Sequence, residues 1–128
     1  MILDSSALVA IALDERDRDA LVAKIDQADM VAVAAPTLAE AGIVLSSRTG
    51  QAAAPLLERL VAAADAHVIE FGDTHWQEAV LAWWRFGRSR HEARLNFGDC
   101  LAYATARVAQ QPLLAKGKDF ASTDIALA

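Results

Sequence analysis

The stretch MILDSSALVA (residues 1–10) places a carboxylate between two apolar segments. Three apolar residues lead directly into Asp4, and after two serines the chain is apolar again. An apolar run that ends in a charge is typical of a buried strand that reaches the edge of a sheet, where a serine or the acid itself can cap the helix that follows. The stretch therefore predicts a buried strand over 1–4 and a helix over 6–13, joined by an acid that needs a partner.

The same alternation of strand and helix continues along the chain. Apolar segments bounded by turn residues predict strands at 30–34, 67–71, 112–115 and within 122–127. Segments of helical spacing predict helices at 15–28, from Pro36 to Gly50, and at 52–65, 74–86 and 96–109. This order predicts a three-layer α/β/α sandwich with a central, mainly parallel sheet of about five short strands and right-handed crossovers. Because no linker or repeat interrupts residues 1–128, we expect a single domain.

The composition is that of an ordered globular protein, with 55% apolar and 23% charged residues. A single cysteine, Cys100, excludes an internal disulfide framework and suits a reducing compartment. No signal peptide is recognisable, because Met1 runs into a predicted core strand without a basic segment before it. Charges interrupt the apolar stretches well before the ~20 residues that a membrane span needs. We therefore expect a cytoplasmic protein that does not associate with membranes.

Charge is unevenly distributed along the chain. The net charge is −5, but residues 1–80 carry 13 acids and 5 bases, whereas residues 81–128 carry 4 acids and 7 bases. Within RFGRSRHEAR (85–94) Glu92 is the only acid among four arginines. These are Arg85, Arg88, Arg90 and Arg94. A solvated polar loop has this composition too, but an acidic protein with one local basic segment can bind a polyanion there.

Three further acids stand where predicted strands or loops pass into helices or turns. They are Glu40, Asp99 and Asp119. In a parallel sheet such junctions lie along the edge formed by the carboxyl ends of the strands. We therefore expect these three carboxylates to converge with Asp4 at that edge.

Each acid, taken alone, also fits an ordinary structural role. Thr37 and Glu40 match a capping box in the first turn of a helix. Asn96 and Asp99 match an N-cap residue followed by an acid at the third helical position, which is favourable with the helix dipole. The remaining two acids can cap a helix and stabilise a turn.

Convergence favours a shared role. Capping does not require four acids to lie at one end of a sheet, and carboxylates crowded in one cleft raise each other's pKa. A bound cation removes that repulsion. Oxygen ligands without histidine or cysteine indicate Mg²⁺, or alternatively Mn²⁺, rather than zinc. Because Mg²⁺ also contacts substrate phosphates, Lys116, Lys118 and the arginines of 85–94 would supply charge that faces those phosphates.

Taken together, the sequence resembles the PIN-domain ribonucleases, and specifically the VapC-type toxins of bacterial toxin–antitoxin pairs. The matching motifs are MILDSSALVAIAL, APTLAEAGIVL, LNFGDCLAYATA and PLLAKGKDFASTDI, and their order covers essentially the whole chain. The resemblance implies a PIN-like α/β/α fold. It also implies that Asp4, Glu40 and Asp99 are catalytic residues that form a metal site.

The fourth acidic position departs from the family pattern. Many members carry an acid two residues before Asp119, where this chain has Gly117. Asp119 is our choice for the fourth catalytic and metal-binding acid, with Asp124 as the substitute. Ser6 matches a small hydroxyl residue that often assists the first aspartate, and Asn96 matches a polar residue near the third acid.

The implied activity is hydrolysis of an RNA phosphodiester by water that Mg²⁺ activates, leaving a 5′-phosphate and a 3′-hydroxyl. The residues implied to contact RNA are the four arginines of 85–94 and Lys116. The implied protein partner is a VapB-type antitoxin whose tail covers the acidic site, where a basic side chain would replace the metal charge. A homodimer is expected as well.

Two further groups of residues have structural interpretations. Trp76, Val80, Trp83 and Trp84 have helical spacing, so we expect them mostly in the core, with part of this surface available to a homodimer or antitoxin. Cys100 is expected to pack in the core.

Two alternative functions remain open. Aspartate-nucleophile phosphatases also begin with an apolar strand that ends in an acid, but they typically carry a second aspartate where this chain has Ser6. A non-catalytic PIN-like binding module with a degenerate acidic cleft would explain the missing acid at Gly117. The sequence argues against serine catalysis, because Ser5 and Ser6 lack a G-x-S-x-G turn and a histidine nearby in sequence.

Overall fold

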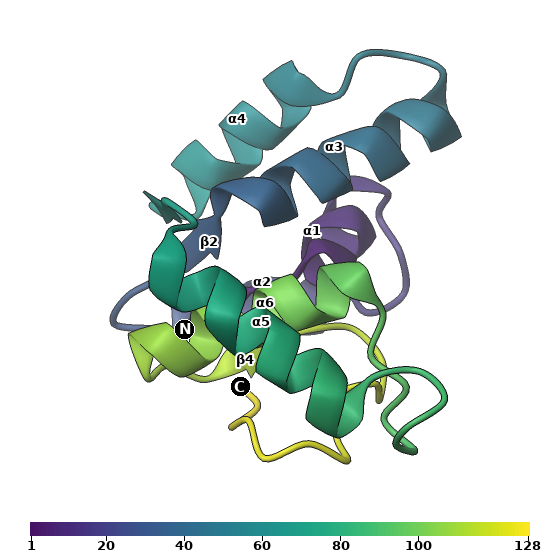
Figure 1. Ribbon diagram of the computed structural model, residues 1–128. Coiled ribbons are helices and arrows are strands. Elements are labelled where there is room, and N and C mark those ends of the chain that lie inside the picture. Colours follow the sequence, from purple (N-terminus) through teal and green to yellow (C-terminus); the bar gives the residue numbers. More distant parts are fainter.

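The computed structural model describes all 128 residues and arranges them around one sheet. The strands are β1 (Ile2–Leu3), β2 (Ala32–Ala34), β3 (His67–Ile69) and β4 (Leu113–Leu114). The helices are α1 (Ser5–Ala12), α2 (Arg18–Asp26), α3 (Ala35–Thr49), α4 (Ala54–Ala63), α5 (Asp73–Phe86) and α6 (Phe97–Ala109). Figure 1 shows α3 and α4 on one side of the molecule and α5 and α6 on the other. The predicted α/β/α fold is confirmed.

The sheet is entirely parallel, with the strand order β3-β2-β1-β4, so that β1 is an inner strand. A fifth strand, predicted within 122–127, is reduced to a single bridge between Leu113 and Leu127. The residues before that bridge are bonded elsewhere: the Thr123 hydroxyl donates to the Phe120 carbonyl, and Asp124 accepts from a tyrosine hydroxyl. The sheet therefore has four strands rather than five.

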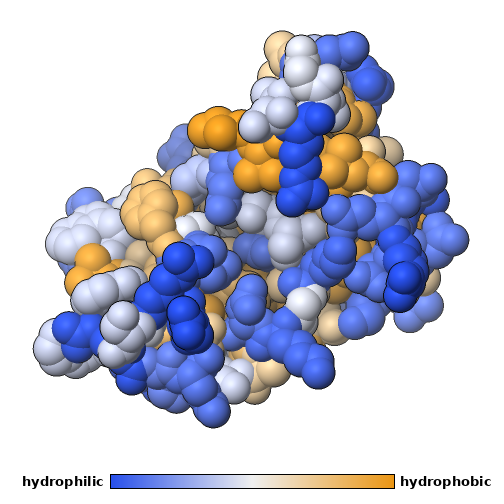
Figure 2. Space-filling model, turned by 90° about the vertical axis from the view of Figure 1, so that its right-hand side faces the viewer, coloured by the Kyte–Doolittle hydropathy of each residue, from blue (hydrophilic) through white to orange (hydrophobic).

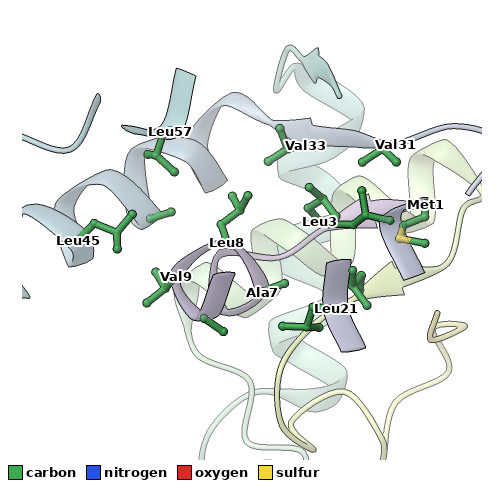
Figure 3. Close-up of a cluster of buried hydrophobic side chains, with 14 of the residues drawn as sticks. Met1, Leu3, Ala7, Leu8, Val9, Leu21, Val31, Val33, Leu45 and Leu57 are labelled. Carbon is green, nitrogen blue, oxygen red and sulfur yellow. The ribbon is translucent and has the colours of Figure 1, made fainter. Parts of the chain in front are cut away.

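Successive strand residues point to opposite faces of the sheet, and each face has its own hydrophobic cluster. The cluster beneath α1 to α4, drawn in Figure 3, takes from the strands Leu3, Val33 and Leu114. The cluster beneath α5 and α6 takes Ile2, Ala32 and Leu113. β1, β2 and β4 are buried on both faces and therefore read as continuous apolar runs, whereas the edge strand β3 is largely exposed.

The ends of α3 follow from residues recognisable in the sequence. Pro36 lies in the first turn, where its missing N–H leaves no bond unmade, and Gly50 ends the helix in the left-handed conformation with φ 71°. The start of α2 is later than predicted, at Arg18, because Asp14 has φ 54° and the chain turns before the helix begins. No helix is both long and apolar enough to cross a membrane.

The aromatic stripe of α5 is not in the core, so this prediction was wrong. Its four residues, Trp76, Val80, Trp83 and Trp84, are between 44% and 63% exposed. The buried residues of α5 are Ala79, Ala82 and Phe86, which pack with α6. The small alanines bring the two helices close together, so that the large rings are left on the flanks of the contact. Cys100 is buried, as predicted.

Candidate active site

Asp4 lies at the carboxyl end of the inner strand β1 and caps α1. Its Oδ2 accepts hydrogen bonds from the Ser6 backbone N–H at 3.0 Å and from the Ser6 hydroxyl at 2.5 Å. The residue is only 2% exposed, and its Oδ1 has no hydrogen-bond partner. Burial raises the pKa of this carboxyl, the bonds from Ser6 lower it, and the charge of Asp119 raises it further. A buried carboxylate oxygen without a donor is destabilising unless a proton or a cation binds it.

Glu40 lies in the second turn of α3 and not in the first. The helix begins at Ala35 without a side-chain cap, so the predicted capping box between Thr37 and Glu40 does not form. The sequence pattern was misleading because α3 starts directly after β2, two residues before Thr37. Since Glu40 does not cap a helix, its carboxylate is available for another role.

The Glu40 carboxylate reaches across to the first turn of α6. It lies so close to Gly98 that a Cβ at that position would overlap it. Burial raises the pKa of Glu40, a hydrogen bond from Ser5 lowers it, and the charge of Asp4 raises it. Glycine at position 98 is therefore required for α3 and α6 to bring this carboxylate beside the other acids.

Asp99 combines a structural role with a place in the acidic group. Its backbone N–H donates to Asn96 Oδ1 at 2.9 Å, and its Oδ2 accepts from the Asn96 backbone N–H at 2.7 Å, which is the predicted cap of α6. Burial raises the pKa of Asp99 to about 6, against the bond from Asn96, and the charges of Asp4, Asp119 and Glu40 raise it too. Three carboxylates therefore act on the fourth.

In metal-free protein, Asp99→Asn is expected to gain stability over the wild type as pH rises from about 4 to about 6. The folded-state pKa of about 6 lies above the ordinary value of 3.8, so the folded wild type binds more protons than the unfolded chain in this window. Its stability therefore falls as pH rises, whereas asparagine does not titrate. Thermal melts of both proteins in EDTA across this window test the expectation; a constant difference in melting temperature would contradict it.

The structure separates the two candidates for the fourth acid. Asp119 is exposed in the turn region after β4, and its charge acts on both Asp4 and Asp99. Asp124 instead accepts from the Tyr103 hydroxyl at 2.5 Å and pairs with Arg85 at 2.9 Å. These partners lower the pKa of Asp124. Asp124 is therefore engaged elsewhere, and the geometry favours Asp119.

Ser6 links the start of the chain to the segment after β4. Its hydroxyl donates to Asp4 and accepts from the Lys116 backbone N–H at 2.9 Å. The Lys116 ammonium forms an ion pair with Glu15, and Glu15 also pairs with Arg48 at 3.3 Å. No local pattern identifies Glu15, because the two cations that pair with it lie 33 and 101 residues further along the chain. The Lys116 ammonium is thus paired in this structure, and its contact with RNA stays a prediction.

The four arginines predicted to bind RNA differ in their surroundings. Arg85 is paired with Asp124. Arg88 and Arg94 are exposed and form no ion pair, whereas the Arg90 guanidinium lies over the rings of two tryptophans. Three of the four arginine charges, those of Arg88, Arg90 and Arg94, therefore have no ion-pair partner.

A groove of about 870 Å³ runs between α3, α5 and α6, and Glu40 is on its wall. Most of its lining is apolar, including Ile43, Phe71, Trp76, Val80, Trp83 and Phe97. The acidic group therefore adjoins an apolar surface.

The carboxylates fit a divalent cation in chemistry but are not closed around one. No three side chains of the ligating types gather where they could hold a metal ion as they stand. Asp4 accepts instead from Ser6, and Asp99 accepts from the Asn96 backbone N–H. The unpartnered Oδ1 of Asp4, the raised pKa values and the all-oxygen donors fit Mg²⁺ or Mn²⁺, which would have to draw the carboxylates together.

Comparison with known proteins gives concordant results. The PIN domain family matches residues 1–126. Ribonuclease VapC36 of Mycobacterium tuberculosis is 44% identical over 126 residues, which is 98% of this chain and 91% of the relative. In structure, the chain resembles M. tuberculosis VapC20, a sarcin-ricin loop cleaving toxin, with TM-score 0.78, 17% identity, and 99% and 97% of the two chains covered. A toxin–antitoxin complex from Klebsiella pneumoniae gives TM-score 0.70 and 18% identity, covering 99% and 95%.

Proposed function

The chain belongs to the PIN-domain family, and we propose that it is a metal-dependent endoribonuclease that acts as the toxin of a VapBC-type toxin–antitoxin pair. The relative VapC36 carries the name of a ribonuclease and is similar along nearly the whole chain. The observation that carries the proposal is the buried Asp4, whose Oδ1 accepts no hydrogen bond. The charges of Asp4, Glu40 and Asp119 all raise the pKa of Asp99, so the four carboxylates lie near one another at this edge of the sheet.

We assign Asp4, Glu40, Asp99 and Asp119 as the catalytic acids and metal ligands. A bound Mg²⁺ or Mn²⁺ would supply a water of lowered pKa and stabilise negative charge on the scissile phosphate. The chain's own residues keep the acids in place: Ser6 orients Asp4 through two hydrogen bonds. Asn96 fixes Asp99 at the start of α6, and Gly98 leaves room for Glu40.

The role of Ser6 argues against an aspartate-nucleophile phosphatase. Such enzymes typically carry a second aspartate where this chain has Ser6, and the Ser6 hydroxyl here donates to the carboxylate that would have to attack. A non-catalytic binding module is the remaining alternative, and it is favoured by the carboxylates' not being closed around a common point.

Purified protein, free of antitoxin, is expected to cleave RNA with Mg²⁺ or Mn²⁺ and to lose this activity in EDTA. Gel analysis of structured RNA with mapping of the new ends measures the cleavage, and 5′-phosphate ends are expected. Calorimetric titration with Mn²⁺ supplies the control for the binding site. Metal binding without cleavage of any RNA tested would favour the binding module over the nuclease.

We propose RNA, an antitoxin and a second copy of the chain as the partners, in the cytoplasm. The likeness to a toxin–antitoxin complex supports the antitoxin, whose basic side chain would neutralise the carboxylates of Asp4 and Asp99. The exposed apolar side chains along the groove between α3 and α5, among them Ile43 and Val80, support a homodimer.

A further inference from the structure

One guanidinium and two indole rings form an ordered group at the end of α5. The Arg90 guanidinium carbon lies 4.0 Å from the centre of the Trp84 ring and 4.6 Å from that of Trp83. Trp84 is nevertheless 63% exposed, so most of its surface faces solvent. A cation over an aromatic face is attractive and restricts both side chains. The group therefore presents flat surfaces, already ordered, to a ligand.

The backbone beneath this group is closely packed. Gly87 lies against Trp83 with no room for a Cβ. The Leu95 N–H donates to the Phe86 carbonyl, and Gly87 and Leu95 form a bridge that closes the base of the loop. The loop is therefore tied to α5 at both ends, and Arg90 is brought back over the helix.

The charge around the rings is positive and unneutralised. Arg88, Arg90 and Arg94 are exposed and none of them takes part in an ion pair, whereas Arg85 is satisfied by Asp124. Glu92 is the only acid in this stretch. A protein with net charge −5 thus carries a local excess of cations beside exposed aromatic rings, which is the combination that single-stranded nucleic acid requires.

The group is connected to the acidic site by the chain itself. The loop leads directly into Asn96, which caps the helix that carries Asp99. Trp83 and Glu40 line the same groove. In Figure 1 this loop projects at the lower right, and Figure 2 shows that side of the molecule as mainly hydrophilic. A strand whose phosphate lies at the carboxylates can therefore extend toward the loop.

We propose that Trp84 and Arg90 form a stacking platform for an unpaired RNA base, while Arg88 and Arg94 contact the neighbouring phosphates. This inference rests on the proposed function and adds to it the place where the substrate is held away from the cut bond. A single strand is required, because the bases of a duplex are stacked on one another and do not offer a free face. The unneutralised cations favour this polyanion over an apolar protein partner.

Binding of a fluorescein-labelled oligoadenylate in EDTA tests the platform without cleavage. Trp84→Ala is expected to weaken binding about ten-fold without changing the salt dependence, because stacking releases no counterions. Arg88→Ala or Arg94→Ala is expected to reduce the slope of log affinity against log salt by about 0.7 each. Trp84→Phe should retain most of the affinity.

Two controls test whether a loss of affinity in Trp84→Ala reflects contact between an RNA base and the Trp84 ring. Leu81→Ala removes another exposed apolar side chain, 52% exposed, from the same helix and should bind as the wild type does. An oligomer with abasic positions should bind wild type and Trp84→Ala equally. If the wild type and Trp84→Ala bind oligoadenylate with equal affinity, the platform is overturned. It is also overturned if Leu81→Ala loses as much affinity as Trp84→Ala.

The outcome also separates the platform from the proposed function. If the wild type cleaves RNA in Mg²⁺ or Mn²⁺ while Trp84→Ala binds and cleaves normally, only the platform is wrong. If the wild type neither binds nor cleaves RNA, both are wrong. If Trp84→Ala changes the molecular mass in solution but not the affinity for RNA, the ring serves a protein contact and the platform is overturned.

Discussion

Replacement of Asp4 by asparagine is expected to lower RNA cleavage roughly 1000-fold, the upper range for loss of one preorganised charged or donor group in an active site. The substitution keeps the shape of the side chain and an oxygen that can accept from Ser6. It removes the negative charge that we assign to the cation. The measurement is kcat/KM on one RNA substrate, with metal saturating for the wild type.

The same variant is expected to be more stable than the wild type when no metal is present. Burial raises the pKa of Asp4, so ionising this carboxyl is less favourable in the folded protein than in the unfolded chain, whereas asparagine does not titrate. The gain should disappear as pH falls below about 4, where the acid is protonated in the folded and unfolded states alike. Thermal melts in EDTA at neutral and acid pH measure this difference.

Asp14→Asn is the matched control for Asp4→Asn. Asp14 is an exposed acid near the end of α1, and its left-handed backbone, with φ 54°, suits asparagine. The Asp14→Asn protein should keep full RNA-cleaving activity and a melting temperature close to that of the wild type. If Asp4→Asn cleaves RNA as the wild type does, Asp4 is excluded from the mechanism. If Asp4→Asn is less stable than the wild type without metal, the charge of Asp4 is already compensated in the metal-free fold.

Gly98→Ala is expected to lower cleavage by about 10- to 100-fold while the protein remains folded. A Cβ at this position would overlap the Glu40 carboxylate, which stands at the end of a flexible side chain and can move away. The fold therefore survives, but Glu40 leaves the other acids. Since alanine favours a helix by up to ~1 kcal/mol over glycine, the melting temperature should stay level or rise.

The contrast between activity and stability makes this substitution informative. kcat/KM and the calorimetric affinity for Mn²⁺ should both fall, although the melting temperature does not. Gly72→Ala is the control, because a Cβ there meets open space. If Gly98→Ala retained wild-type cleavage and metal affinity, the placement of Glu40 against α6 would have no part in catalysis.

The layers of the fold could be predicted because they depend on local patterns. Buried parallel strands read as short apolar runs, and Pro36 and Gly50 mark the ends of a helix. The exposure of the α5 stripe could not be predicted in this way. Helical spacing shows which residues share a face, but it was the alanines, Ala79 and Ala82, that let α5 approach α6 and left Trp76 exposed.

The candidate site was predictable in its acids but not in its supporting contacts. Asp4 and Asp99 follow recognisable strand and cap signals. Arg85, by contrast, finds Asp124 39 residues later, and Lys116 finds Glu15 101 residues earlier. Nothing in the local sequence distinguishes a charge that faces RNA from one that is already paired, because such pairs form only when distant segments pack together.

The position of β1 has a consequence for the protein as it leaves the ribosome. This inner strand pairs with β4, and Ser6 beside it bonds to Lys116, 110 residues further on. Asp4 is made early, but its surroundings are completed only when the far end of the chain arrives. A nascent or prematurely terminated chain therefore lacks the assembled acidic edge. Translation itself thus delays assembly of the acidic edge until β4 and the segment around Lys116 have been synthesised.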